Sequence, residues 1–278
     1  MERIDCSEIK KYLRGEADIY IFDSVSSTNT LALEMLRSEK ISPTCKRPAA
    51  IIARRQVAGR GRLGRAWFAA DNIEGASLCM SVVVPVRVGA SGLAAWTVRA
   101  GVSICVQLRK LGANVFLKWP NDIYDAHDRK LAGMLSEFDM AGKGEEWHRI
   151  IFGVGVNCNF NNVKLPDDLE AIASDVSKVC GYEASVNRCA AVVIDAAIEA
   201  SDFYNFPKAQ SEVSLPAAFA AVDALAGRQV SADIGFNSYS GKACGINDNG
   251  ELLIKISDSE IVALGSGEAS LSKSFRKI

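Results

Sequence analysis

The pattern of apolar segments changes near residue 223 and divides the chain into two parts. Residues 1–222 contain apolar runs of both strand and helix type, mixed rather than strictly alternating. From Gly227 onward the chain has short strand-like runs separated by turn residues such as Asn247 to Gly250, namely VSADIGF, GKACGIND, ELLIKISD and EIVALGSG. About fifty residues of this kind predict a small β-barrel. We therefore expect one domain over residues 1–222 and a second over residues 223–278.

The first part is expected to form an α+β domain, a mixed β-sheet with helices packed on one face. Its apolar, β-branched runs predict strands at 17–24, 49–55, 77–84, 114–118 and 147–156. The polar turn 125–129 predicts a hairpin between 123–124 and 130–137. We expect Pro85 to stop the strand before it. Helical composition is found at 27–37, 91–111, 188–204 and 215–225.

Charge and cysteine usage limit the classes of function. The formal net charge is −1, from 32 basic and 33 acidic residues, so any basic site must be local. No apolar run reaches the roughly 18 residues that span a bilayer, and the N-terminus lacks the apolar stretch of a signal peptide. The eight cysteines are not paired in the spacing of zinc sites, and only two histidines are present. Free thiols in a reducing cytoplasm are the favoured interpretation.

A loop rich in glycine and arginine follows the second predicted strand. It reads RRQVAGRGRLGR over residues 54–65, and its last three arginines alternate with glycines. Glycine lets backbone amides approach an anion closely, and arginine offers a planar fork of donors for carboxylate or phosphate. The Gly-Lys-Ser/Thr ending of a P-loop is absent. The loop therefore predicts an anion site. The alternatives are a solvated loop or a contact with nucleic acid.

A second polar cluster is Lys118 to Asp122, KWPND. The lysine can neutralise a polyphosphate, Asn121 can pair with an adenine edge, and Asp122 can orient a lysine or help hold Mg²⁺. An ordinary turn explains these residues slightly better when they are taken alone. Further on, Lys130 precedes Gly133, and Gly153 to Asn157 end an apolar strand with two glycines. Such glycines indicate close approach by a ligand or another backbone, whereas the lysine also suits an edge strand.

The order and spacing of these segments resemble the catalytic domain of biotin–protein ligases. The matching segments are Ser27-Thr28-Asn29, GRGRLGRAW, KWPNDIY, RKLAGMLSE and GVGVN. The resemblance runs from about residue 17 to residue 160 and resumes in about the last fifty residues. It implies a class II synthetase-like biotin/lipoate ligase domain followed by a small SH3-like barrel. Ser77 stands where the family usually has asparagine. About sixteen residues precede the first strand, so we expect no N-terminal DNA-binding domain.

The resemblance also assigns roles to residues of the predicted site. The biotin-binding residues would be Ser27, Thr28, Asn29, Gln56, Arg60, Gly61, Arg62, Lys130 and Gly133. The ATP-binding residues would be Arg62, Arg65, Trp67, Lys118, Asn121 and Asn157, with Trp67 covering the adenine. Lys130, Arg60 and Arg62 would carry the catalysis. Mg²⁺ would be held through the phosphates, near Asp122.

The function implied is that of a monofunctional, cytoplasmic ligase. With ATP it would activate biotin as biotinyl-5′-adenylate and transfer it to a lysine of a biotin carboxyl carrier protein. The resemblance implies no DNA and no membrane as partners, and it allows a homodimer. Two other functions compete with this one. A lipoate–protein ligase would activate an acid without a urea ring, and a non-enzymatic biotin sensor or nucleic-acid binder would release no pyrophosphate.

Overall fold

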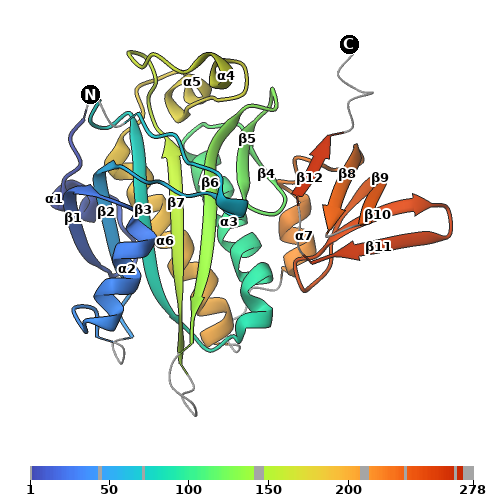
Figure 1. The fold of residues 1–278 in the computed structure, drawn as a ribbon, viewed down its shortest axis with the longest axis horizontal. Helices are drawn as coiled ribbons and strands as arrows, with labels where there is room; N and C mark the ends of the chain where they lie inside the picture. The colour runs from blue at the N-terminus through green and yellow to red at the C-terminus, as the bar shows by residue number, and fades with distance from the viewer. Residues whose placement is uncertain are drawn as a thin grey trace.

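Two β-sheets organise the chain in the computed structural model, which describes residues 2–42, 46–70, 73–140, 147–206, 213–234, 237–265 and 268–271. Within these ranges the larger sheet has seven strands in the order β1-β2-β3-β7-β6-β5-β4 (Figure 1). The smaller sheet has five, in the order β11-β10-β9-β8-β12. The smaller sheet lies beside the β4–β5 edge of the larger one.

The larger sheet is mixed, as expected. β1 and β2 pair in parallel, whereas β2–β3, β3–β7, β6–β7, β5–β6 and β4–β5 are antiparallel. Its strands are β1 (Asp18–Val25), β2 (Ala49–Gln56), β3 (Ser77–Val86), β4 (Val115–Lys118), β5 (Asp122–Asp125), β6 (Lys130–Asp139) and β7 (His148–Asn157).

One predicted strand end is wrong, because β3 continues through Pro85 to Val86. The pairing of β3 with β2 covers Cys79 to Val83, so no strand pairs with β3 on that side at Pro85. Its other neighbour, β7, pairs Arg149 with Pro85. A proline at a position with one free side costs the sheet little.

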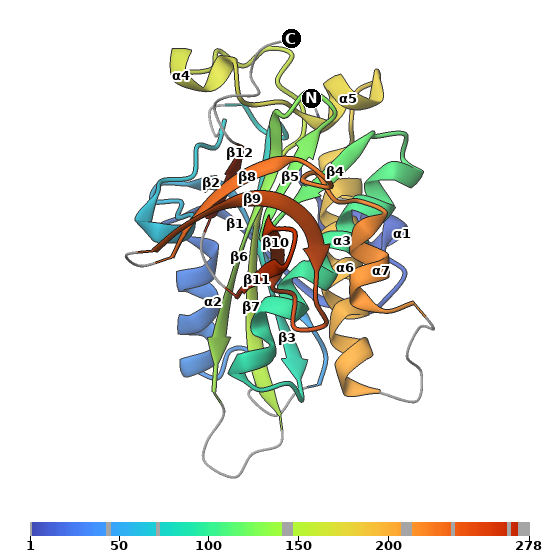
Figure 2. The same cartoon turned by 90° about the vertical axis from the view of Figure 1, so that its right-hand side faces the viewer.

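The helices lie on both faces of the larger sheet. They are α1 (Cys6–Tyr12), α2 (Thr28–Arg37), α3 (Leu93–Lys110), α4 (Asp167–Glu170), α5 (Val176–Cys180), α6 (Val186–Asn205) and α7 (Leu215–Ala220), with 3₁₀ turns η1 (Arg62–Gly64) and η2 (Ala90–Gly92). Figure 2 shows α3 and α6 on one face, as expected, and α2 on the opposite face, which is a correction. Helix α7 is shorter than the predicted 215–225. The short helices α1, α4 and α5 were not predicted.

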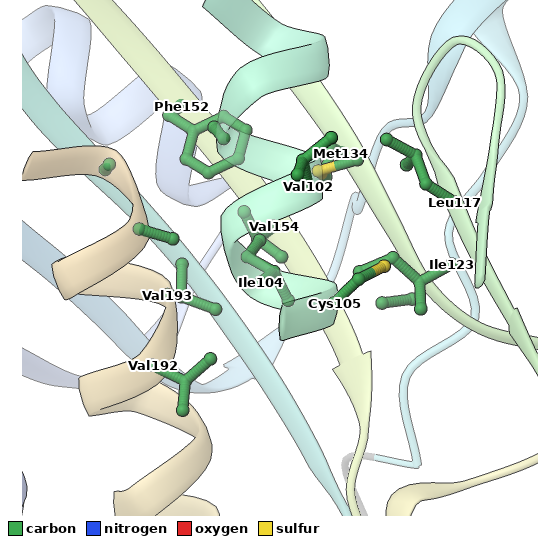
Figure 3. Packing of buried hydrophobic residues seen from close by; sticks show 14 of the residues in the cluster. Val102, Ile104, Cys105, Leu117, Ile123, Met134, Phe152, Val154, Val192 and Val193 are labelled. Carbon is green, nitrogen blue, oxygen red and sulfur yellow. The ribbon is translucent and has the colours of Figure 1, made fainter. Parts of the chain in front are cut away.

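Alternation along the strands explains how both faces are covered. In β7, Phe152 and Val154 point to the main core under α3 and α6 (Figure 3), whereas Ile151 belongs to the cluster under α2. Successive side chains of a strand point to opposite faces, so one apolar strand supplies both clusters. Trp96 of α3 meets Phe152 edge-on at 5.1 Å between ring centroids.

The second sheet is antiparallel and consists of β8 (Gln229–Ile234), β9 (Asn237–Ile246), β10 (Leu252–Ser257), β11 (Glu260–Leu264) and β12 (Glu268–Leu271). The connecting residues run beside β4, where the Leu117 amide donates to the Val222 carbonyl at 2.7 Å. The division at residue 223 stays a prediction. None of the helices in the described ranges combines the length and hydropathy of a membrane span.

Candidate functional site

Three glycines that line a cleft lie together on the α2 face of the larger sheet. Gly133 of β6 pairs with Gly155 of β7, and Gly153 lies two residues before Gly155 on the same face. A Cβ atom at Gly153 would collide with the Asn29 side chain, and one at Gly155 would collide with the Trp67 indole. Their neighbours on the other face are buried in the core. The absence of side chains at these positions therefore lets Asn29 and Trp67 lie close against the sheet.

A buried hydrogen-bond network lines one part of this cleft. Gln56 Oε1 accepts from the Thr28 amide at 2.8 Å and from Thr28 Oγ1 at 3.2 Å. Ser81 Oγ lies 2.7 Å from Thr28 Oγ1 and donates to Asn29 Oδ1 at 2.6 Å. Ser27 is the N-cap residue that precedes α2, yet its side chain makes no capping hydrogen bond with the helix amides. The polar groups are thus held in fixed directions before any ligand arrives.

Glu137 connects this network to the arginine loop. Its Oε2 accepts from Asn29 Nδ2 at 2.6 Å, and its Oε1 lies 3.9 Å from Arg60 Nη2. Arg60 also donates to Thr30 Oγ1 at 3.1 Å. Asn29 Nδ2 donates in addition to the Leu135 carbonyl at 3.2 Å. Both hydrogens of the Asn29 side-chain amide are therefore used within the protein. Asn29 thus fixes neighbouring residues of the cleft and offers no free donor to a ligand.

The arginine loop folds back on itself as a small hairpin over the cleft. The Gly61 amide donates to the Arg65 carbonyl at 2.7 Å, and the Trp67 amide donates to the Gly59 carbonyl at 2.9 Å. Leu63 and Gly64 form the tip with positive φ angles of 55° and 72°, and Leu63 is 78% exposed. The loop therefore combines a fixed base with a solvent-exposed tip, as expected of a segment that closes over a ligand.

Lys130 lines the cleft between Asp122 and Trp67. Its Nζ is 2.7 Å from Asp122 Oδ1 and 5.5 Å from the centroid of the Trp67 ring. The Lys130 side chain passes over Gly133, whose added Cβ would lie 3.2 Å from Nζ. The Lys130 amide donates to the Ile172 carbonyl at 2.8 Å. Of the two roles considered for Asp122, orienting a lysine is the one that this geometry supports.

Two asparagines predicted to contact a nucleotide are held by the protein itself. Asn121 Nδ2 donates to the Met134 carbonyl at 2.6 Å, and Asn121 Oδ1 accepts from Arg62 at 3.2 Å. Asn157 Nδ2 donates to the carbonyls of Lys130 at 3.3 Å and Ser174 at 2.9 Å. These contacts fix the strand ends around Lys130, and a nucleotide contact for either residue stays a prediction.

The fifteen predicted site residues all line one cleft of about 1830 Å³. They are Ser27, Thr28, Asn29, Gln56, Arg60, Gly61, Arg62, Arg65, Trp67, Lys118, Asn121, Asp122, Lys130, Gly133 and Asn157. Counted over the residues that the structure describes, seven basic and three acidic side chains line it. The chain as a whole has net charge −1, so positive charge is concentrated here. A site of this kind attracts anions.

One buried donor in the cleft lacks an acceptor. Trp67 Nε1 is buried and has no hydrogen-bond partner in the described part of the chain. An unpaired buried donor is costly, so a bound ligand with an acceptor group would stabilise this arrangement. A metal held by the protein fits less well. Asp122 is engaged by Lys130, and no group of three metal-ligating side chains occurs among the described residues. The expected Mg²⁺ stays a prediction.

Several residues beside or lining the cleft were not predicted as site residues. Ser81 is one of two hydroxyl residues in the fully buried strand β3, and a polar residue in such an apolar run is a signal that could have indicated it. Ser77, where the family usually has asparagine, accepts from the Ala70 amide at 3.1 Å and so anchors the segment after the arginine loop. Arg228, just before β8, and Lys242 of β9 also line the cleft. No local sequence pattern predicts this contribution from the C-terminal part of the chain.

Comparisons with known proteins agree with these observations. Residues 21–157 match the biotin/lipoate A/B protein ligase family, and residues 226–272 match the biotin protein ligase C terminal domain. The chain is 35% identical over 158 residues to the bifunctional ligase/repressor BirA of Escherichia coli, covering 55% of this chain and 46% of that protein. It is 33% identical to the biotin–[acetyl-CoA-carboxylase] ligase of Paracoccus denitrificans over 135 residues, covering 47% and 50%.

The chain thus spans about half the length of the curated relatives it matches. Among solved structures, it is similar to a biotin protein ligase from Aquifex aeolicus in complex with biotin and ATP. The TM-score is 0.69 at 24% identity, covering 92% of this chain and 98% of the other. At this identity the likeness shows the fold alone.

Proposed function

The chain belongs to the biotin protein ligase family, and from this premise we propose that it activates biotin with ATP and transfers it to a lysine of a biotin carboxyl carrier domain. The observation that carries the proposal is the convergence of two kinds of group in one cleft. The hydrogen-bonded network around Thr28 and Gln56, here called the polar end, lies in the same cleft as Arg62 and Lys130, here called the cationic end.

The polar end suits the ureido ring of biotin. Gln56 Oε1 is occupied by two donors from Thr28, so the Gln56 amide nitrogen is the group left to donate to a ureido oxygen. The Ser27 hydroxyl is not used in capping and adds a further polar group at the same place. Gly153 and Gly155 line the cleft there without adding side chains that would compete with the fused rings. The valerate tail then extends toward Lys130 and the arginine loop.

The cationic end suits adenylation. A carboxylate oxygen of biotin attacks the α-phosphorus of ATP, the bond between the α-phosphorus and its bridging oxygen breaks, and pyrophosphate leaves with the electron pair. Negative charge grows on the α-phosphate oxygens during this step. Lys130, oriented by Asp122 at 2.7 Å, stabilises that charge together with Arg60 and Arg62. Both reactants are anions, so cationic side chains also lower their mutual repulsion.

The product is a mixed anhydride that water would hydrolyse. The loop Gly59–Trp67 lies beside Lys130 and has an exposed tip, so its closure would exclude water from the anhydride. The neutral amine of an acceptor lysine then attacks the carbonyl carbon. An amide forms, AMP leaves, and the amine proton is released. Mg²⁺ would reach the site on the phosphates of ATP, because Asp122 already pairs with Lys130.

Lipoate is the alternative substrate, and the family model that matches residues 21–157 includes lipoate ligases. The match of residues 226–272 to the biotin protein ligase C-terminal domain favours biotin. A urea also uses the polar network, whereas the dithiolane ring of lipoate offers no hydrogen-bond partner for it.

Pyrophosphate release tests the proposal. The protein is mixed with ATP and either biotin, lipoate or neither. We expect release with biotin alone, and label should appear on a carrier domain whose lysine is intact but not on one whose lysine is replaced by arginine. Release with lipoate would indicate a lipoate ligase. Biotin binding without release would indicate a sensor.

A further inference from the structure

A buried hydrogen bond joins the smaller sheet to the predicted nucleotide side of the cleft. Trp119 Nε1 donates to the Gly250 carbonyl at 2.9 Å across 131 positions of sequence. Trp119 is 2% exposed, and Gly250 is buried. Because a buried donor that loses its acceptor is costly, this bond keeps the indole in one position.

The turn that carries Gly250 is fixed by its own hydrogen bonds. Asn247 Oδ1 accepts from the amides of Asn249 and Glu251 at 3.1 and 3.0 Å, and the Gly250 amide donates to the Asn247 carbonyl at 2.9 Å. Gly250 has φ +74°, and a Cβ there would lie 2.8 Å from the Ala95 Cα of α3. The turn therefore packs backbone to backbone against the larger domain, with no space for a side chain.

Trp119 lies two and three residues before Asn121 and Asp122, which contact two of the cationic side chains in the cleft. Asn121 bonds to β6 through its side chain and its backbone carbonyl, which accepts from the Met134 amide at 2.9 Å. Its Oδ1 accepts from Arg62, and the next residue, Asp122, holds Lys130. A displaced Trp119 would shift Asn121 and Asp122, and with them two cations of the cleft.

The smaller sheet makes a second tie to the same region. Both terminal nitrogens of Arg228 donate hydrogen bonds to the carboxylate of Asp128, at 2.6 and 2.7 Å. This pairing lowers the pKa of the Asp128 carboxyl, so the carboxylate stays charged. Asp128 lies in the turn that leads into Lys130. The segment from Trp119 to Asp128, which contains β5, is thus held at both of its ends from the C-terminal part of the chain.

We propose that the turn Asn247–Gly250 is a positioning element for adenylation, acting through Trp119 on the pair Asp122–Lys130 and on Asn121. The inference rests on the proposed function and deepens it. The smaller sheet then contributes to the first chemical step as well as to any docking of the acceptor. It does so by fixing the position of the cationic end of the cleft relative to the polar end.

Gly250→Ala is the test, with Gly245→Ala as its matched control. Both glycines have positive φ, +74° and +90°, so both variants carry similar backbone strain, but a Cβ at Gly245 meets nothing within 4 Å. We expect kcat/KM for ATP in biotin-dependent pyrophosphate release to fall about tenfold in Gly250→Ala relative to Gly245→Ala, because small misplacements of reacting groups are costly. Biotin affinity, measured by calorimetry, should change much less.

A second pair of variants covers the case in which Gly250→Ala does not fold. Trp119→Phe removes the donor to Gly250, and Trp96→Phe makes the same change in the core, where Trp96 Nε1 donates to Ser201 at 3.3 Å. Trp119→Phe should lower kcat/KM for ATP, and Trp96→Phe should not. The inference alone would be overturned if kcat/KM for ATP were equal in the two variants of each pair. It would also be overturned if Gly250→Ala or Trp119→Phe lost biotin affinity and kcat/KM to the same extent. A wild type that releases no pyrophosphate with biotin would overturn the proposed function as well.

Discussion

Replacing Lys130 by alanine separates the rate of adenylation from the stability of the fold. The side chain is 33% exposed, and its partner Asp122 is 16% exposed, so the pair is only partly withdrawn from water. Losing such an ion pair costs at most about 1 kcal/mol of folding free energy, which lowers the unfolding midpoint by about 2–4 °C. Losing a cation that stabilises transition-state charge costs about 10²–10³ in rate, or roughly 2.7–4 kcal/mol.

The two costs are measured on the same preparation. Adenylate formation is followed in a single turnover with excess protein, saturating biotin and ATP labelled at the α-phosphate, and unfolding is followed by calorimetry. Lys10→Ala serves as the control, because Lys10 is exposed on α1 and does not line the cleft. A folded Lys130→Ala variant that forms adenylate within about threefold of the wild-type rate would refute the role given to Lys130.

Three further changes have defined outcomes. Arg62→Ala should weaken biotin binding and release adenylate into solution, seen as increased labelling of bystander lysines; unchanged labelling with weaker binding would refute the covering role of the loop. Glu137→Gln keeps an acceptor for Asn29 but loses the charge near Arg60, so it should bind biotin almost normally and release adenylate faster. Glu137→Ala loses the acceptor as well as the charge, so it should also bind biotin more weakly; equal biotin affinity in the two variants would contradict this. Burial raises the pKa of the Asp223 carboxyl to about 6. The charged carboxylate therefore destabilises the fold increasingly as pH rises from about 4 through 6. Asp223→Asn should stabilise the protein by roughly 2 kcal/mol at pH 7.5 and by nothing at pH 3. A pH-independent effect in urea unfolding would disprove that account.

Much of the larger sheet was predictable, because its strands are long apolar runs bounded by clear turn residues. The hairpin around residues 125–129 and the end of α3 just before Gly112 follow from local chemistry alone. The placement of α2 did not follow. Its apolar stripe shows that one face is buried but not which face of the sheet covers it. The short helices α4 and α5 were missed, since four or five residues carry no periodicity.

The site was predictable as a set of residues and not as a geometry. Glycines in an apolar strand signalled a close approach, and Gly153 and Gly155 do lie under Asn29 and Trp67. The partner of each polar group depends on strand register, which the sequence does not reveal. The pairing of Asp122 with Lys130 and the contact from the smaller sheet to Trp119 are of this kind. They join segments whose proximity only the fold creates.

The direct measurement of the central claim is the recovery of the intermediate itself. The protein is incubated with biotin and ATP without any acceptor, separated from free nucleotide and analysed by mass spectrometry. The account predicts about one biotinyl-5′-adenylate held per chain, lost when biotin is omitted and converted to AMP and labelled protein when a carrier domain is added. Recovery of intact biotin and ATP, with no mixed anhydride under any of these conditions, would contradict it.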